Sequence, residues 1–236
     1  MTTTALITGA NKGIGFEIAR LLGERGVTAI VGARDEERGR AAAERLGQPY
    51  VRLDVTDESS VLAAAKWIEQ EYGALDILVN NAGIVVWQDD PAPSATPADR
   101  LRETYEVNVF GVVTVTNAML PLLREAPAAR IVNMSSELGS LQLAMDPDSP
   151  FWPLTFVAYN SSKSALNMVT AAYAKELWDT PIKVNAANPG YCATDLNAHS
   201  GFRTAEQGAA IAVRLATLDA DGPTGAFMQD DGPLPW

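Results

Sequence analysis

The chain has one cysteine, Cys192, and one histidine, His199, among its 236 residues. A single cysteine can form neither an intrachain disulfide nor a cysteine-rich metal site, and we expect no bound metal. Basic residues are also scarce: 18 lysines and arginines stand against 29 aspartates and glutamates, which makes the net charge −11. This balance argues against nonspecific binding to nucleic acid or to an anionic membrane, because both need a basic surface.

Long hydrophobic runs are missing as well. The longest uncharged stretch, residues 107–123, contains two asparagines, two threonines and a proline, so we interpret it as a buried helix rather than a membrane span. Residues 1–6 lack the basic and apolar segments of a signal peptide, and none is expected. With 47% hydrophobic and 20% charged residues, the composition indicates a globular, cytoplasmic enzyme or binding protein.

Apolar, β-branched runs alternate with longer segments of helical period along almost the whole chain. Strands are expected at residues 5–8, 27–31, 50–53, 77–79, 131–134 and 182–186. Helices are expected at residues 14–25, 36–46, 58–72, 100–123 and 157–178. The alternation predicts an α/β fold in which helices cover both faces of a parallel sheet. The length suits a single domain, residues 1–236.

One segment, residues 138–155, breaks this rhythm. It contains three prolines together with Phe151 and Trp152, and it has no clear period. Either it is an irregular surface loop or it is a lid or wall of a binding pocket, since long loops without regular structure are often functional.

A glycine-rich turn, Thr-Gly-Ala-Asn-Lys-Gly-Ile-Gly at residues 8–15, joins the first expected strand to the first expected helix. Its glycines allow a tight turn and a close approach of the backbone to a pyrophosphate. The helix N-terminus then offers unpaired N–H groups and the positive end of its dipole to that anion. Glycine patterns alone are weak evidence, but the placement between strand and helix strongly favours a dinucleotide site.

Basic residues near the end of the second strand favour NADP(H). An NAD site usually has an acid there to hold the ribose 2′-OH. In this chain Arg34, Arg38 and Lys12 could converge on a 2′-phosphate instead. Asp35 argues in the other direction, and the alternative is that both arginines belong only to the solvated face of a charged helix.

Tyr159 and Lys163 stand four residues apart and therefore share one face of an expected helix. A free tyrosine has a pKa of about 10 and is a poor proton shuttle near neutrality. A neighbouring ammonium favours the phenolate and brings the pKa of the tyrosine closer to that range. Such a pair is common on protein surfaces, so its meaning depends on the motifs that accompany it.

Five motifs together resemble those of the short-chain dehydrogenase/reductase family. They are the glycine turn, Asn-Asn-Ala-Gly at residues 80–83, the Ser135-Ser136 pair, Tyr-x-x-x-Lys at residues 159–163, and Pro189-Gly190. The resemblance covers essentially the whole chain and is most similar to the carbonyl-reductase group of the single-domain branch. It implies a Rossmann-type, doubly wound parallel sheet of about seven strands. It also implies reversible, NADPH-dependent reduction of a ketone or aldehyde by hydride transfer.

The resemblance also implies the catalytic roles. Tyr159 would protonate the carbonyl oxygen, and Ser136 would polarise it, while Ser135 would be structural. Lys163 would hold the nicotinamide ribose and lower the pKa of Tyr159. Asn108 would support a water-linked proton relay, although without the family it could equally satisfy backbone groups.

Cofactor contacts are implied along the whole chain. Asp54 and Val55 would lie at the adenine, although an acid there could also be a helix N-cap, and Asn-Ala-Gly could be a plain turn. Pro189, Gly190 and Thr194 would line the nicotinamide end. The expected cofactor residues are Gly9, Asn11, Lys12, Gly13, Ile14, Gly15, Arg34, Arg38, Asp54, Val55, Asn81, Ala82, Gly83, Tyr159, Lys163, Pro189, Gly190 and Thr194.

The chain departs from the family in one spacing. Ser136 precedes Tyr159 by 23 positions, whereas a dozen or so is usual in the family. The resemblance suggests that the extra residues lie at the mouth of the substrate site. They would also affect a helix face used for dimerisation, which leaves monomer, dimer and tetramer open. Candidates for an apolar pocket wall are Met145, Phe151, Trp152, Tyr191 and Phe202.

Two residues and two rival functions complete the expectations. Cys192 is better explained as a small buried filler than as a reactive thiol, and His199 is given no catalytic role.

One rival function is a non-enzymatic NADP(H)-binding redox sensor, which would not need Ser136, Tyr159 and Lys163 together. The other is an NAD-linked alcohol dehydrogenase on the same fold, because sequence does not set the direction of the reaction.

Overall fold

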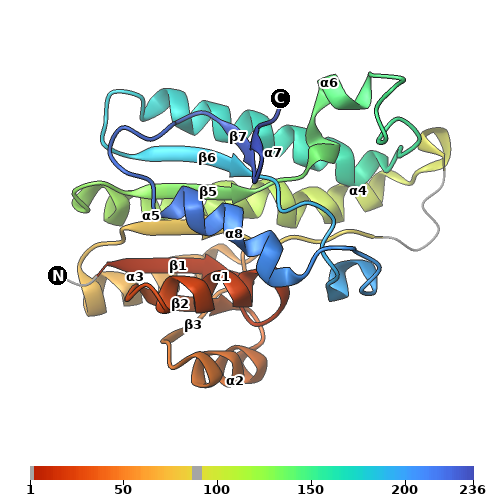
Figure 1. The fold of residues 1–236 in the computed structure, drawn as a ribbon. Coiled ribbons are helices and arrows are strands. Elements are labelled where there is room, and N and C mark those ends of the chain that lie inside the picture. Colours follow the sequence, from red (N-terminus) through yellow and green to blue (C-terminus); the bar gives the residue numbers. More distant parts are fainter. Residues whose placement is uncertain (1–2, 87–91) are drawn as a thin grey trace.

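A computed structural model describes residues 3–86 and 92–236, which contain one sheet with helices on both faces (Figure 1). The strands are ordered β3-β2-β1-β4-β5-β6-β7-β8; the first seven in this order run parallel, and only β8 is antiparallel, to β7. The predicted doubly wound parallel sheet is therefore confirmed. The strands are β1 (Thr4–Thr8), β2 (Thr28–Ala33), β3 (Tyr50–Arg52), β4 (Ile77–Asn80), β5 (Arg130–Met134), β6 (Lys183–Ala187), β7 (Phe227–Gln229) and β8 (Gly232–Pro233).

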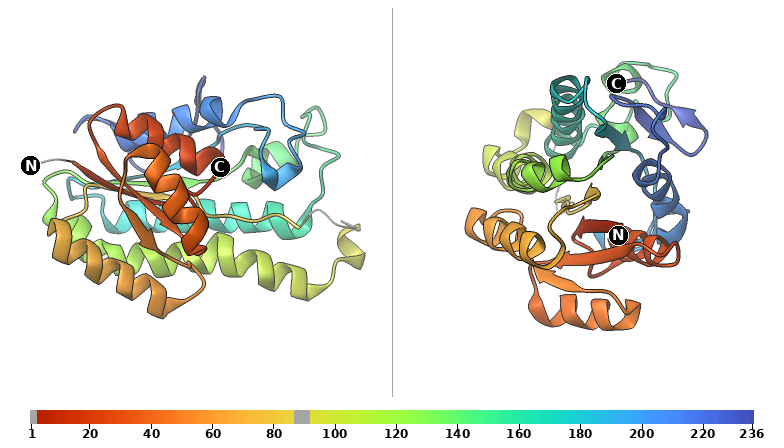
Figure 2. Two further views of the ribbon diagram at one scale, coloured as in Figure 1. Left: turned by 90° about the horizontal axis from the view of Figure 1, so that it is seen from below. Right: turned by 90° about the vertical axis from the view of Figure 1, so that its left-hand side faces the viewer.

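The helices divide between the two faces of the sheet (Figure 2). In β1, Ile7 packs into the apolar cluster that includes residues of α1, α2 and α8, whereas Leu6 packs into the one formed with α3, α5 and α7. Alternate residues of a strand point to opposite faces, so a sheet covered on both sides needs apolar residues throughout its central strands. The helices are α1 (Gly13–Gly23), α2 (Glu36–Leu46), α3 (Glu58–Tyr72), α4 (Ala98–Tyr105), α5 (Gly111–Glu125), α6 (Leu141–Ala144), α7 (Val157–Glu176) and α8 (Ala205–Ala216).

The expected helix at residues 100–123 is a composite. It begins as α4, passes through a π-helical turn at Glu106–Phe110 and continues as α5. The segment Ala98–Glu125 is long and apolar enough to cross a membrane, but 56% of its apolar window is buried inside the protein. It packs against α3, α7 and β4, which explains its apolar residues as those of a core helix.

The irregular segment at residues 138–155 contains more structure than its sequence indicates. It begins within a 3₁₀ turn at Glu137–Gly139 and includes the short helix α6, whose N-terminus is capped by the hydroxyl of Ser140 accepting from the Leu143 N–H at 3.2 Å. The hydroxyl of Ser140 also donates to the carbonyl of Trp236 at 3.4 Å, and the Trp236 ring stacks on buried Phe227. The base of the segment is thus attached to the C-terminal strands.

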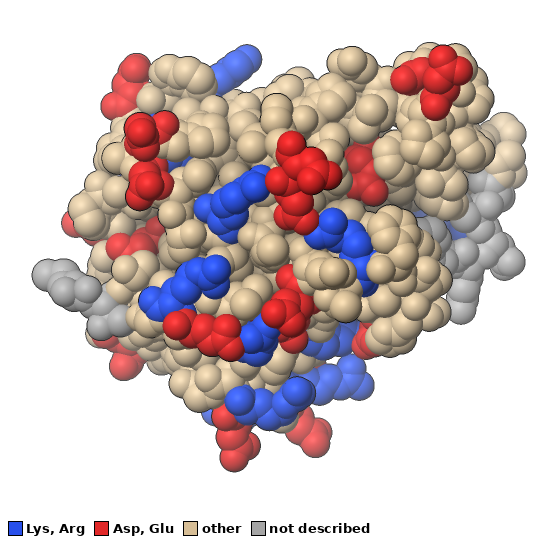
Figure 3. Space-filling model, in the orientation of Figure 1, with Lys and Arg blue, Asp and Glu red and all other residues tan. Residues whose placement is uncertain are grey.

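Acidic and basic side chains are interspersed on the face shown in Figure 3.

The N-cap of helix α3 corrects an alternative drawn from the sequence, because the capping residue is Asp57 and not Asp54. The carboxylate of Asp57 accepts from the hydroxyl of Ser59 and from the N–H groups of Ser59 and Ser60, which lowers its pKa. Asp54 instead accepts from the N–H and hydroxyl of Thr56 in the preceding turn.

Asp57→Ala should therefore lower the melting temperature, by about 2–4 °C, because it removes a helix cap from a chain of this size. The pKa of Asp57 is lower in the folded state than in the unfolded chain. Its stabilising effect is consequently present above the unfolded pKa and is lost as the pH falls through the folded pKa. Thermal melts of wild type, Asp57→Ala and Asp54→Ala at neutral and acidic pH measure both effects. An equal drop in the two variants at neutral pH would contradict this assignment of the cap.

Candidate active site

Two glycines in the left-handed backbone conformation, and one close contact at a third glycine, shape the glycine turn. Gly9 and Gly13 have φ values of +65° and +57°, a conformation that other residues rarely adopt. A Cβ on Gly15 would lie 2.4 Å from the side-chain nitrogen of Asn81 and 2.7 Å from the carbonyl oxygen of Gly9. Helix α1 starts at Gly13, and no side chain caps it. Its first N–H groups are thus available to an anion.

Asn81 fastens the end of β4 to this turn. Its side-chain nitrogen donates to the carbonyls of Thr8 and Gly9 at 2.8 and 3.3 Å. The hydroxyl of Thr8 in turn accepts from the N–H groups of Asn81 and Ala82 at 3.0 and 2.9 Å. These four hydrogen bonds link the two neighbouring strand ends and hold the turn in place.

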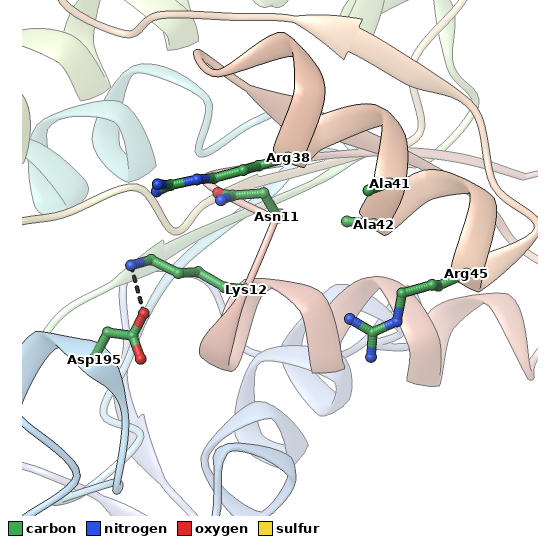
Figure 4. A pocket seen from close by; sticks show the side chains of 7 residues that line it. All are labelled: Asn11, Lys12, Arg38, Ala41, Ala42, Arg45 and Asp195. Atoms are coloured by element: carbon green, nitrogen blue, oxygen red, sulfur yellow. Dashed lines mark hydrogen bonds and ion pairs between the residues drawn. The ribbon is translucent and has the colours of Figure 1, made fainter.

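A cleft of about 440 Å³ adjoins the turn (Figure 4). Lys12 and Arg38 both line it, whereas Arg34 is exposed and is not part of its wall. Arg45, which sequence reasoning missed, supplies a third cation; it follows Arg38 by seven residues and so shares its face of α2. The cleft is lined by Asn11, Lys12, Arg38, Ala41, Ala42, Arg45 and Asp195.

Ion pairs hold two of the three cations of the cleft, Lys12 and Arg38, whereas the guanidinium of Arg45 lies over the ring of Phe16. The ammonium of Lys12 lies 2.7 Å from one carboxylate oxygen of Asp195, and the imidazole of His199 lies 3.0 Å from the other. The hydrogen bond from Lys12 is the main cause of the lowered pKa of Asp195. The guanidinium of Arg38 lies 3.6 Å from Asp35. Exposed pairs of this kind are weak, so a phosphate can replace either carboxylate at little cost.

Ser136, Tyr159 and Lys163 meet beyond the ends of β5 and β6. Ser136 follows β5, and its hydroxyl forms a hydrogen bond with the phenol of Tyr159 in the first turn of α7. The ammonium of Lys163 lies 5.6 Å from the centre of the Tyr159 ring. It donates to the carbonyl of Met134 at 2.8 Å. The three residues predicted from the motifs therefore form one cluster, while the hydroxyl of Ser135 donates to Asn167 in the buried interior.

Burial is the main cause of the shifted pKa values of Tyr159 and Lys163. It raises the pKa of Tyr159 to about 12; the hydrogen bond with Ser136 acts in the opposite direction, and the charge of Glu137 adds to the rise. Burial also lowers the pKa of Lys163 to about 8. The sequence predicted that Lys163 would lower the pKa of Tyr159, and the structure differs. The ammonium lies over the face of the ring and donates to the Met134 carbonyl, and it is not among the causes of the shift of the Tyr159 pKa.

Asn108 lies in the π-helical turn and is buried. Its amide nitrogen donates to the carbonyl of Ile84 at 2.9 Å and to the hydroxyl of Ser162 at 3.1 Å, and its oxygen accepts from the N–H of Ile84 at 2.9 Å. A Cβ on Gly83 would lie 3.4 Å from the Asn108 oxygen and 3.8 Å from the Lys163 nitrogen. Asn108 thus satisfies backbone groups, as one alternative expected, and does so beside Lys163.

The remaining expected residues border the same edge of the sheet. Gly190 adopts a φ of +70°, and the methyl group of Thr194 lies 3.6 Å from where a Cβ of Gly13 would be. Val55 is buried against Gly111. Cys192 is buried, and burial raises the pKa of its thiol, which fits an inert filler.

Sequence reasoning missed two polar residues near Ser136. The side-chain oxygen of Asn188, at the end of β6, accepts from the N–H groups of Glu137 and Gly190, both at 3.2 Å. Asn188 therefore joins the serine turn to the Pro189-Gly190 turn. The only signal in the sequence was adjacency, since Glu137 directly follows Ser136 and Asn188 directly precedes Pro189.

The aromatic and sulfur side chains proposed as a pocket wall are mostly exposed. Tyr191 and Phe202 pack edge to face with ring centres 6.0 Å apart. Met145 and Trp152 are exposed on the irregular segment, and Phe151 is half-buried. Most of these side chains therefore form open surface and not the wall of an enclosed pocket.

Comparisons with known proteins agree with this geometry. A family model described as short chain dehydrogenase matches residues 3–204. The chain is 41% identical to the short-chain dehydrogenase anuI of Penicillium roqueforti over 90% of this chain and 87% of the relative. It is 34% identical to an NADPH carbonyl reductase of Bos taurus over 98% of each chain. An NADPH-bound carbonyl reductase from chicken fatty liver superposes with a TM-score of 0.85 at 27% identity, covering 100% of this chain and 99% of that one.

Proposed function

Because the chain belongs to the short-chain dehydrogenase family, we propose that it is an NADPH-dependent reductase that converts a ketone or aldehyde into an alcohol by reversible hydride transfer. Membership makes it an oxidoreductase of that family. The observation that carries the finer proposal is the cluster of Ser136, Tyr159 and Lys163 at the carboxyl end of the sheet. Ligands of open α/β sheets bind at this edge.

The glycine turn and the basic cleft would hold the cofactor. The uncapped N-terminus of α1 suits the pyrophosphate, and Lys12 and Arg38 suit a 2′-phosphate. Asp54 and Val55 would lie at the adenine, and Pro189, Gly190 and Thr194 at the nicotinamide. The relatives whose names specify NADPH support this cofactor over NADH. When bound, the cofactor supplies the hydride, and the chain supplies position and a proton.

The side chains of the cluster would divide the remaining work. The Ser136 hydroxyl would donate to the substrate oxygen and polarise the carbonyl, and Tyr159 would deliver a proton to that oxygen. Lys163 would hold the nicotinamide ribose, with Asn108 beside it supporting proton relay to solvent. A tyrosine with a pKa of about 12 is protonated at neutral pH, so Tyr159 has a proton to give to a carbonyl oxygen.

Further properties follow as proposals. We infer a cytoplasmic enzyme with a small-molecule substrate, built as a single domain over residues 1–236. The irregular segment at residues 138–155 would border the substrate entrance, opposite the pair Tyr191 and Phe202. The open apolar surface around these residues supports a hydrophobic ketone as substrate.

The test is oxidation of NADPH and NADH, followed by absorbance, against a panel of ketones, aldehydes and quinones. Binding of each cofactor is measured separately by fluorescence. We expect turnover of at least one carbonyl compound with NADPH, and less than a tenth of that rate with NADH. Each 1.4 kcal/mol of contact with the 2′-phosphate corresponds to about a tenfold preference for NADPH. Tight NADPH binding without turnover of any carbonyl would favour the redox-sensor alternative.

A further inference from the structure

Glu137 is a partly buried acid beside the catalytic cluster, and the proposed mechanism does not use it. It directly follows Ser136 and begins the 3₁₀ turn Glu137–Gly139. This turn is pressed against α7: a Cβ on Gly139 would lie 2.7 Å from the carbonyl carbon of Lys163, and the hydroxyl of Ser164 donates to the Gly139 carbonyl at 2.9 Å. Glu137 is therefore fixed next to the helix that carries Tyr159 and Lys163.

The carboxyl group of Glu137 is only partly satisfied. It accepts from its own main-chain N–H and from the side chain of Asn188, and the same N–H also donates to the Asn188 oxygen at 3.2 Å. Its second oxygen, Oε2, is enclosed by protein and has no hydrogen-bond partner among the described residues. A charge on this oxygen is poorly screened, because protein encloses it and no donor among the described residues reaches it.

Among the described residues, no cation lies within ion-pair distance of Glu137. Four titratable or charged groups surround it and Tyr159, namely Lys163, Arg203, Asp230 and Cys192. Arg203 is paired with Asp230 and also donates to the carbonyl of Gln207 at 2.8 Å. Lys163 donates to Met134, and burial raises the pKa of the Cys192 thiol. In the described part of the chain, Glu137 forms no ion pair within 4 Å; burial raises its pKa, and the charge of Arg203 acts in the opposite direction from a greater distance.

We propose that Glu137 is a positioning residue that keeps Tyr159 protonated by placing an unpaired negative charge beside it. An ionised Glu137 repels a phenolate at Tyr159, since two like charges in a poorly solvated site raise each other's cost of ionisation. Carbonyl reduction then continues to a higher pH, and alcohol oxidation begins only at a higher pH. The overall equilibrium of the reaction is unchanged. The consequences for turnover rest on the proposed function, whereas the effect on the phenol does not.

Glu137→Gln is the sharpest test, because it keeps the shape and the hydrogen bond with Asn188 and removes the charge. The readout is phenolate absorbance against pH, taken as the difference between each protein and its Tyr159→Phe counterpart, so that the other tyrosines cancel. Circular dichroism defines the alkaline range in which each protein stays folded. We expect the ionisation of Tyr159 to move down by roughly half to one pH unit, a three- to tenfold change in the phenolate-to-phenol ratio at a given pH.

Two further variants make the result specific. Glu176→Gln removes the same charge from an exposed site at the far end of α7, and it should leave the titration unchanged. Glu137→Met removes the charge without adding a donor, and it replaces Glu137→Gln if that variant fails to fold. A downward shift in both Glu137 variants supports the proposal, whereas a shift in Glu137→Gln alone assigns the effect to the new amide donor and overturns it.

Activity profiles extend the test. In the Glu137 variants, the alkaline loss of carbonyl reduction and the onset of alcohol oxidation should both move down in pH by the same amount as the phenol titration. A Tyr159 titration that superimposes on that of wild type contradicts the inference, whatever the activity. Absence of turnover in wild type together with a shifted titration would instead refute the proposed function and retain the role of Glu137.

Discussion

Tyr159→Phe is expected to reduce kcat for carbonyl reduction by about 10²–10⁴-fold, the usual contribution of a positioned general acid. The substitution removes only the hydroxyl that forms a hydrogen bond with Ser136. The ring, and its contact with the Lys163 ammonium at 5.6 Å, are retained. Affinity for NADPH should change little, because the glycine turn and the basic cleft are untouched. The loss should therefore appear in turnover and not in cofactor binding.

The measurement is steady-state NADPH oxidation with the best substrate of the panel, together with NADPH fluorescence titration. Tyr173→Phe is the matched control, because Tyr173 lies on the same helix and its hydroxyl donates to Asn117 at an exposed position. Wild-type kcat in Tyr159→Phe would exclude the tyrosine as proton donor. A parallel loss of kcat and NADPH affinity would indicate a structural defect instead.

The second large effect concerns the choice of cofactor. Lys12→Ala combined with Arg38→Ala should weaken NADPH binding by about 10²-fold or more, because each charge-assisted contact with a phosphate is worth about tenfold or more. NADH lacks the 2′-phosphate, so its affinity should change only slightly. Removing Lys12 also leaves the carboxylate of Asp195 without its partner at 2.7 Å, which adds repulsion toward a phosphate.

The comparison needs dissociation constants of both cofactors at two ionic strengths. Arg40→Ala serves as control, because Arg40 lies on the same helix but pairs with Glu36 and covers the ring of Tyr50. Adding Asp195→Asn to the double variant should restore part of the NADPH affinity. Equal weakening of NADPH and NADH binding would show that these cations do not select the 2′-phosphate.

Local patterns predicted much of the scaffold. Continuous apolar runs such as the one ending at Thr8 indicated central strands, because a sheet covered on both faces has no polar side. Strands β7 and β8 were not predicted: Phe-Met-Gln and Gly-Pro are too short to show a period, and they become strands by pairing with β6 and with each other. The π-helical turn at Asn108 was also invisible, since its sequence suits an ordinary helix.

In the candidate site, too, local patterns predicted some features and only the folded chain decided others. Tyr159 and Lys163 were predicted as neighbours because an interval of four residues places two side chains on one helix face. The role of Arg34 was expected from its distance to the strand end, but only folding shows that Arg38 and Arg45 reach the cleft and Arg34 does not. Asp195 is 183 residues from Lys12, and no local pattern could predict their contact.

By itself, the sequence determined the alternation of strands and helices, the position of the glycine turn, and the identity of the residues that can bind phosphate and move a proton. These properties depend on neighbours a few residues away, where backbone geometry fixes the spacing. The tertiary structure alone decided which cations share a cleft, which oxygen of Glu137 has no partner, and that burial raises the pKa of Tyr159 instead of Lys163 lowering it. Solvent exclusion and electrostatic fields depend on segments brought together from the whole chain, and therefore arise only when it folds.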